Sequence, residues 1–154
     1  MSLIKSNENC VDNYLQMNII FEEKLTEDIR EKYILLELDT FSPEPNVFKK
    51  CWALIGKDEV NVQEVHNMDQ FTDLHHNMIK NYGLKNWKFC HDALDHLIGK
   101  FRGEIDSFYR IMRERVEQLE KINLPDTWSP VVITYGNKEK PNEMANDTSN
   151  NNNQ

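Results

Sequence analysis

The sequence predicts one α+β domain. A small antiparallel sheet, formed by a hairpin at about residues 32–55, packs against a helical hairpin and a third helix at about residues 69–121. Two observations carry this prediction. Apolar and polar side chains alternate with a period of two in the first region, whereas apolar side chains recur at three- and four-residue steps in the second. Strands that are followed by helices, instead of alternating with them, are typical of α+β proteins.

A short helix is expected before the hairpin, because Thr26 is a favourable N-cap for a helix at residues 27–30. The first strand of the hairpin then occupies residues 33–41. Its alternation places Ile34, Leu36 and Leu38 on one face of the strand and Glu37 and Asp39 on the other.

The second strand of the hairpin is expected at residues 47–55, which are rich in β-forming side chains. Residues 42–46 contain two prolines, which cannot continue a regular element, and they are predicted to form a five-residue turn. The two strands and this turn together indicate an antiparallel hairpin. Three closely spaced valines, Val60, Val62 and Val65, indicate a short further strand.

Three helices follow in the second half of the chain. The first is expected to be capped by Asp69 and to end at Gly83, and the second begins after Asn86 and carries a wide apolar stripe. The third spans about residues 104–121, where carboxylates and arginines four residues apart are expected to pair along the helix. The β-branched run at residues 131–135 is expected to return as a short strand against the hairpin.

Both ends of the chain are polar. Residues 1–16 are interpreted as a flexible N-terminal arm, and residues 136–154 as a disordered, asparagine-rich tail. The tail has almost no apolar side chains that would offset the entropy cost of ordering its backbone. The predicted folded domain is therefore residues 17–135, which is long enough to form a single core.

The composition excludes several classes of protein. The chain has 154 residues, with 26 acidic and 18 basic side chains and a net charge of −8. This acidity argues against direct nucleic-acid binding, because phosphates need a basic face. No apolar run reaches the roughly 18 residues of a membrane-spanning helix, and the first residues lack the apolar core of a secretory signal. We therefore expect a cytoplasmic protein that does not bind membranes.

The amino-acid composition and several short sequence blocks indicate a phage origin. Asparagine occurs 18 times and alanine 3 times, which indicates an AT-rich genome. The blocks at residues 74–75, 81–82, 85–87, 89–90, 96–97 and 103–109 are similar to those of small uncharacterised proteins of T4-like marine phages. This resemblance implies a phage origin, with the host cytoplasm as the place of action, and it implies no mechanism.

The helical region also resembles a single hairpin of the tetratricopeptide type over residues 74–101. The segment at residues 85–87 stands where that repeat has its turn, and Cys90, Leu94 and Leu97 stand on apolar positions of its second helix. No second copy follows at the 34-residue spacing of such repeats. The resemblance implies that the helical hairpin binds a protein partner.

Five residues are the candidates for contact with that partner. Arg102, Arg110 and Arg113 are three of only five arginines, and a guanidinium is a good bidentate ligand for carboxylates and phosphates. Pairing with carboxylates of the same helix is the alternative interpretation for these arginines. Trp87 and Trp128 flank turns, where a half-exposed indole ring can anchor an interface.

A metal site is the alternative to a partner surface. His91 and Asp95 have the i,i+4 spacing of ligands on one helical face, and His75 lies on the preceding helix. The competing interpretation is that these side chains cap helices or are solvated beside the core. No cofactor and no catalytic residue is expected, because no convergent set of acid, base and nucleophile is present in the sequence.

The sequence as a whole favours a small, non-enzymatic accessory protein, encoded by a phage, that binds a protein partner through its helical hairpin. A metal-dependent enzyme or ligand-binding protein that uses the histidine and aspartate faces is the alternative. A third hypothesis is an acidic decoy that occupies a nucleic-acid-binding protein of the host, for which the charge of −8 is the motive.

Overall fold

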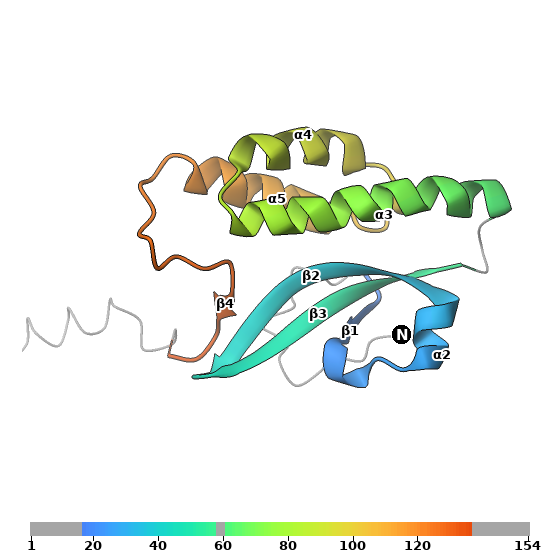
Figure 1. The fold of residues 1–154 in the computed structure, drawn as a ribbon, viewed down its shortest axis with the longest axis horizontal. Coiled ribbons are helices and arrows are strands. Elements are labelled where there is room, and N and C mark those ends of the chain that lie inside the picture. The colour runs from blue at the N-terminus through green and yellow to red at the C-terminus, as the bar shows by residue number, and fades with distance from the viewer. Residues whose placement is uncertain (1–16, 58–60, 137–154) are drawn as a thin grey trace, which may run out of the picture.

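The computed structural model describes residues 17–57 and 61–136, and it confirms the α+β fold class. One mixed sheet of four strands lies beneath a layer of three helices (Figure 1). The strand order across the sheet is β1 (Ile19–Phe21), β3 (Val47–Gly56), β2 (Tyr33–Glu44) and β4 (Val132–Ile133). The helical layer consists of α3 (Val62–Gly83), α4 (Trp87–Leu97) and α5 (Asp106–Leu119).

The hairpin of β2 and β3 forms the centre of the sheet, as predicted, but its turn is shorter than expected. Glu44 pairs with Val47, so only Pro45 and Asn46 connect the two strands. Asn46 adopts a left-handed conformation with φ of 66°, which asparagine tolerates better than most residues. The strand continues past Pro43 because the register shifts there, and a proline without an N–H fits at such an irregularity.

The short elements around the hairpin are mostly those expected. The helix α2 (Glu27–Lys32) begins as predicted, because the hydroxyl oxygen of Thr26 accepts a hydrogen bond from the Ile29 N–H at 3.2 Å. β1 pairs with β3 in the antiparallel sense, and β4 returns as a strand that is parallel to β2, which confirms the expected return of the chain.

The expected strand after the hairpin is wrong, and so is the expected start of the first long helix. Val62 and Val65 belong to α3, and Val60 lies outside the described residues. The helix begins at a capping box, in which the Asn61 side chain accepts from the Glu64 N–H at 2.8 Å and the Glu64 carboxylate accepts from the Asn61 N–H at 3.4 Å. This box starts α3 two turns before Asp69.

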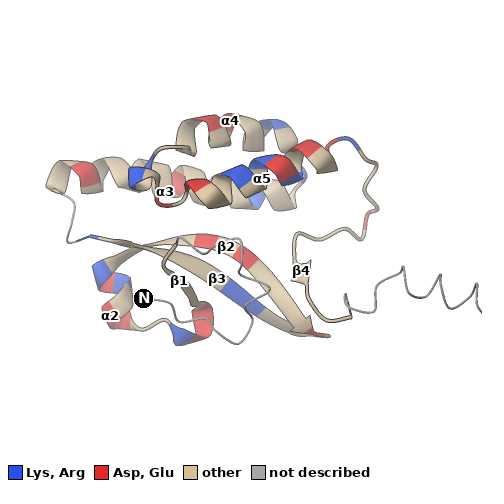
Figure 2. Ribbon diagram, turned by 180° about the vertical axis from the view of Figure 1, so that it is seen from behind, with Lys and Arg blue, Asp and Glu red and all other residues tan. Residues whose placement is uncertain are grey.

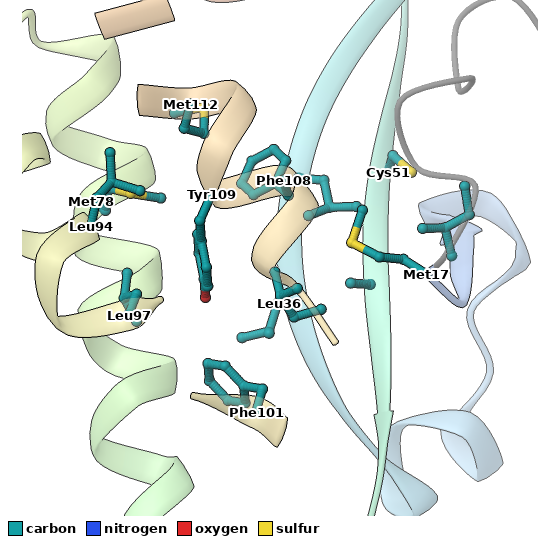
Figure 3. Close-up of a cluster of buried hydrophobic side chains, with 14 of the residues drawn as sticks. Met17, Leu36, Cys51, Met78, Leu94, Leu97, Phe101, Phe108, Tyr109 and Met112 are labelled. Carbon is teal, nitrogen blue, oxygen red and sulfur yellow. The ribbon is translucent and has the colours of Figure 1, made fainter. Parts of the chain in front are cut away.

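The core lies between the helical layer and the sheet. Figure 3 shows Leu36 of β2 beside Phe101, Phe108 and Tyr109, which come from the segment after α4 and from α5. Leu36, Phe108 and Tyr109 are fully buried, and Phe101 is 3% exposed. These large side chains join the two layers, because removing their apolar surface from water is the main stabilising contribution to a domain of this size.

The arm at residues 1–16 and the tail at residues 137–154 lie outside the described residues, so their predicted character stays a prediction. Within the described ranges, no helix is long and apolar enough to cross a membrane. The third helix spans slightly fewer residues than expected, since α5 begins at Asp106 and ends at Leu119.

Candidate interaction surface

Three aromatic rings meet at the end of the helical layer where α3 passes into α4. Tyr82 is in the last turn of α3, Trp87 is the first residue of α4, and Trp128 comes from the segment after α5. Their ring centroids are 5.7 to 5.9 Å apart and all three pairs are edge-to-face. This geometry is favourable for aromatic pairs and holds both half-buried indole rings in place.

A tight turn brings Tyr82 and Trp87 together. Lys85 adopts a left-handed conformation with φ of 65°, and the Asn86 side chain accepts from the Phe89 N–H at 3.4 Å as the cap of α4. α4 and α5 run antiparallel, since His91 contacts Glu120 at the end of α5, whereas Asp95, farther along α4, pairs with Arg113, which comes earlier in α5. The end of α5 therefore lies beside the start of α4, and the segment that follows α5 brings Trp128 onto the two other rings.

Two large apolar side chains are exposed at this same end. Leu84, which follows α3, is 66% exposed, and Ile122, which follows α5, is 58% exposed. Single exposed apolar side chains are common, but these two lie in the chain segments that carry the half-buried tryptophans, Leu84 before Trp87 and Ile122 before Trp128. We call Tyr82, Leu84, Trp87, Ile122 and Trp128 the tryptophan end; Figure 1 shows it where α3 meets α4 and the chain leaves α5.

The candidate arginines lie away from the tryptophan end. Arg102 and Arg110 line a surface hollow at the opposite end of α5, a helix of 14 residues that is about 20 Å long. Arg102 already pairs with Glu104 at 2.8 Å, and Arg113 pairs with Asp95 of α4 at 2.7 Å. The five predicted contact residues therefore do not form one surface.

The arginines of α5 do not form the ion pairs within the helix that were expected. Arg113 reaches Asp95 of the neighbouring helix, and Arg115 reaches Asp39 of β2 at 2.7 and 2.9 Å in a bidentate pair. Among the described residues, Arg110 makes no ion pair. Arg113 and Arg115 thus tie α5 to α4 and to β2, through charge-assisted hydrogen bonds to carboxylates of those elements.

Asp39 is buried, although the alternation of the strand places it on the face opposite to Ile34, Leu36 and Leu38. It is only 7% exposed, because the register of β2 against β3 shifts between Glu37 and Thr40 and turns this side chain inward. Its carboxylate is compensated by the guanidinium of Arg115, which also lowers the otherwise raised pKa of Tyr82. Burial is the main cause that raises the Tyr82 pKa. The ion pair therefore connects the tryptophan end to the sheet.

His75 is fully buried between α3, α5 and β2. Its Nε2 lies 2.6 Å from the Glu37 carbonyl oxygen, which can only accept, so Nε2 carries the proton. The Tyr109 hydroxyl, 3.0 Å from Nδ1, then donates to the second ring nitrogen. Burial is the main cause that lowers the His75 pKa to about 3, and the ring is neutral near pH 7.

The next residue completes the contact with β2. The Glu37 N–H donates to Nε2 of His76 at 3.3 Å, so the two adjacent histidines satisfy both main-chain groups of Glu37. His76 is half-buried, and burial is the main cause that lowers its pKa. The sequence signal for His75 was its place in the apolar stripe of α3, between Phe71 and Met78.

The three candidate metal ligands have separate partners. His75 is bonded to Tyr109 and Glu37, His91 contacts Glu120 at 3.1 Å, and Asp95 pairs with Arg113. In the described part of the chain, no group of three histidine, cysteine, aspartate or glutamate residues is arranged to hold a metal ion. Comparison with known proteins found no matching family model, curated protein or solved structure.

Proposed function

We propose that this chain is a small accessory protein, phage-encoded and acting in the host cytoplasm, that binds a protein partner through its α3–α4 hairpin without a catalytic role of its own. The observation that carries the proposal is the tryptophan end. It combines the exposed side chains of Leu84 and Ile122 with the rigid, half-buried rings of Trp87 and Trp128.

The geometry of this end is suited to binding. Covering an exposed leucine or isoleucine side chain contributes up to about 1.5–3 kcal/mol, depending on how completely it is buried. Aromatic side chains in well-packed settings are enriched among the residues that dominate interface energies. Because Trp87 and Trp128 are already held by each other and by Tyr82, a partner would lose little side-chain entropy in covering them.

Affinity capture tests this proposal when it is paired with two exposed-site variants. The tagged full chain is used to capture proteins from a lysate of the host cells, in parallel with Leu84→Glu and Phe48→Glu. Phe48 is the matched control, since it is 62% exposed but lies on β3. We expect a partner that is retained by the wild type and by Phe48→Glu and lost with Leu84→Glu. If no captured protein depends on Leu84, the proposed surface is wrong.

A further inference from the structure

We propose that the partner segment that docks on the tryptophan end is acidic, with an apolar anchor flanked by aspartate or glutamate. This inference rests on the proposed function and adds the chemistry of the partner. It follows from a local reversal of charge. Residues 80–88 and 119–130 contain four lysines and two carboxylates, a net charge of +2, in a chain whose total is −8.

The lysines surround the apolar side chains of this end. Lys80 is in the last turns of α3, Lys85 is in the turn before α4, Lys88 is in the first turn of α4, and Lys121 follows α5. Figure 2 shows basic segments at the start of α4 and just beyond α5. An apolar centre with a charged rim is the usual anatomy of a protein–protein interface, and the sign of the rim selects the partner.

These lysines are accessible to a partner. Lys80 and Lys121 are exposed, and neither makes an ion pair within the described residues. Lys88 contacts Asp92 at 3.0 Å, but its side chain is 85% exposed, and such surface pairs contribute little and exchange readily. Lys85 donates to the Pro125 carbonyl oxygen at 3.4 Å, which keeps its charge beside the segment that carries Trp128.

The two carboxylates do not cancel this rim. Glu120 contacts the ring of His91 at 3.1 Å, and Asp126 lies in the segment after α5. These two negative charges are outnumbered by the four lysines. An acidic segment approaching this end is therefore attracted by the rim, and it is repelled by most of the remaining surface, which carries the excess of negative charge. This difference directs the segment to the tryptophan end.

Selection from a random peptide display library tests the inference with a defined probe. The purified full chain is the bait, and each enriched peptide is then measured against three variants. These are Leu84→Glu, the double variant Lys88→Glu/Lys121→Glu, and the control Lys24→Glu/Lys32→Glu. The control makes the same charge change at Lys32, the last residue of α2, and at Lys24, which comes just before α2. Figure 1 shows α2 at the opposite end of the molecule from the junction of α3 and α4. The control also matches the pairing, because Lys32 contacts Asp28 at i,i+4 as Lys88 contacts Asp92.

We expect the enriched peptides that depend on Leu84 to carry an aromatic or aliphatic anchor beside acidic residues. Their affinity should fall about tenfold or more with Lys88→Glu/Lys121→Glu in 50 mM salt and by less than about threefold in 0.5 M salt, because salt screens exposed charges. The control should leave it unchanged. Leu84-dependent peptides with neutral or basic flanks would overturn the inference of an acidic partner and leave the proposed function standing. A selection without any Leu84-dependent peptide would overturn the proposed function with it.

Discussion

Acid should destabilise this fold through His75, and the size of the effect follows from its burial. The His75 pKa is lowered from 6.5 to about 3 in the folded chain, whereas the unfolded chain keeps the ordinary value. Between these values the unfolded state binds the proton and the folded state does not, so stability falls as pH falls. Above pH 6.5 the ring is neutral in both states, and His75 costs the fold no stability. The loss of stability grows as the pH falls from 6.5 toward 3.

The magnitude can be worked from the same two values. Each pH unit below 6.5 costs about 1.4 kcal/mol, so two units, from pH 6.5 to 4.5, cost about 3 kcal/mol from this one ring. That is a large share of the roughly 5–15 kcal/mol by which a domain is stable. Other groups also titrate in this range, so the test is a comparison between variants.

The comparison uses urea unfolding followed by tryptophan fluorescence at pH 7.0, 6.0, 5.0 and 4.5. His75→Gln keeps an N–H donor for the Glu37 carbonyl but has no titrating ring, and His66→Gln makes the same change at an exposed position of α3. We expect wild type and His66→Gln to lose about 3 kcal/mol more than His75→Gln between pH 7.0 and 4.5. Equal losses in all three proteins would refute the reasoning from burial.

Three further predictions concern the contacts that hold the layers together. Arg115→Met should lower the free energy of unfolding by about 3 kcal/mol in urea titrations, because it removes the guanidinium that pairs with the buried Asp39 carboxylate. The double variant Asp39→Leu/Arg115→Met should recover most of that loss, and a double variant as unstable as the single one would count against the explanation. Trp128→Ala should cost about 2 kcal/mol and reduce the near-ultraviolet circular dichroism of the aromatic cluster; an unchanged spectrum would contradict the observed ring packing. Asn61→Ala should cost about 1 kcal/mol and speed amide exchange in the first turn of α3, whereas unaltered exchange there would show that the capping box does not hold that turn.

Sequence periodicity was sufficient for the architecture, because the hairpin and the helices each keep one face toward a common core. Periodicity and β-propensity failed after the hairpin, where the start of a helix competes with them. The valines after the hairpin favoured a strand, but the capping box of Asn61 and Glu64 places Val62 and Val65 in α3. β-propensity is a weak preference, and here the helix start overrides it.

The site was harder to predict than the fold, since it depends on irregular and tertiary features. The alternation of β2 places Asp39 on the face opposite to the apolar side chains, and only the register shift after Glu37 turns it toward Arg115. Helical spacing likewise suggested partners for Arg113 within α5, whereas the nearest carboxylate belongs to Asp95 of α4. The half-buried positions of Trp87 and Trp128 agree with the prediction that they flank turns, because turns bring rings together at the surface.

The histidine contacts with Glu37 also reduce the number of main-chain groups of β2 that could pair with a strand of another molecule. β4 covers β2 at Phe41 and Ser42, and His75 and His76 occupy the main chain of Glu37 farther along the same strand. Unoccupied main-chain groups on a strand edge are templates for pairing with another chain. A proton on Nε2 of His76 removes the acceptor of the Glu37 N–H and frees that main-chain group, whereas a protonated His75 still donates to the Glu37 carbonyl. Acid exposure should make aggregation of this protein depend on concentration before the domain has fully unfolded.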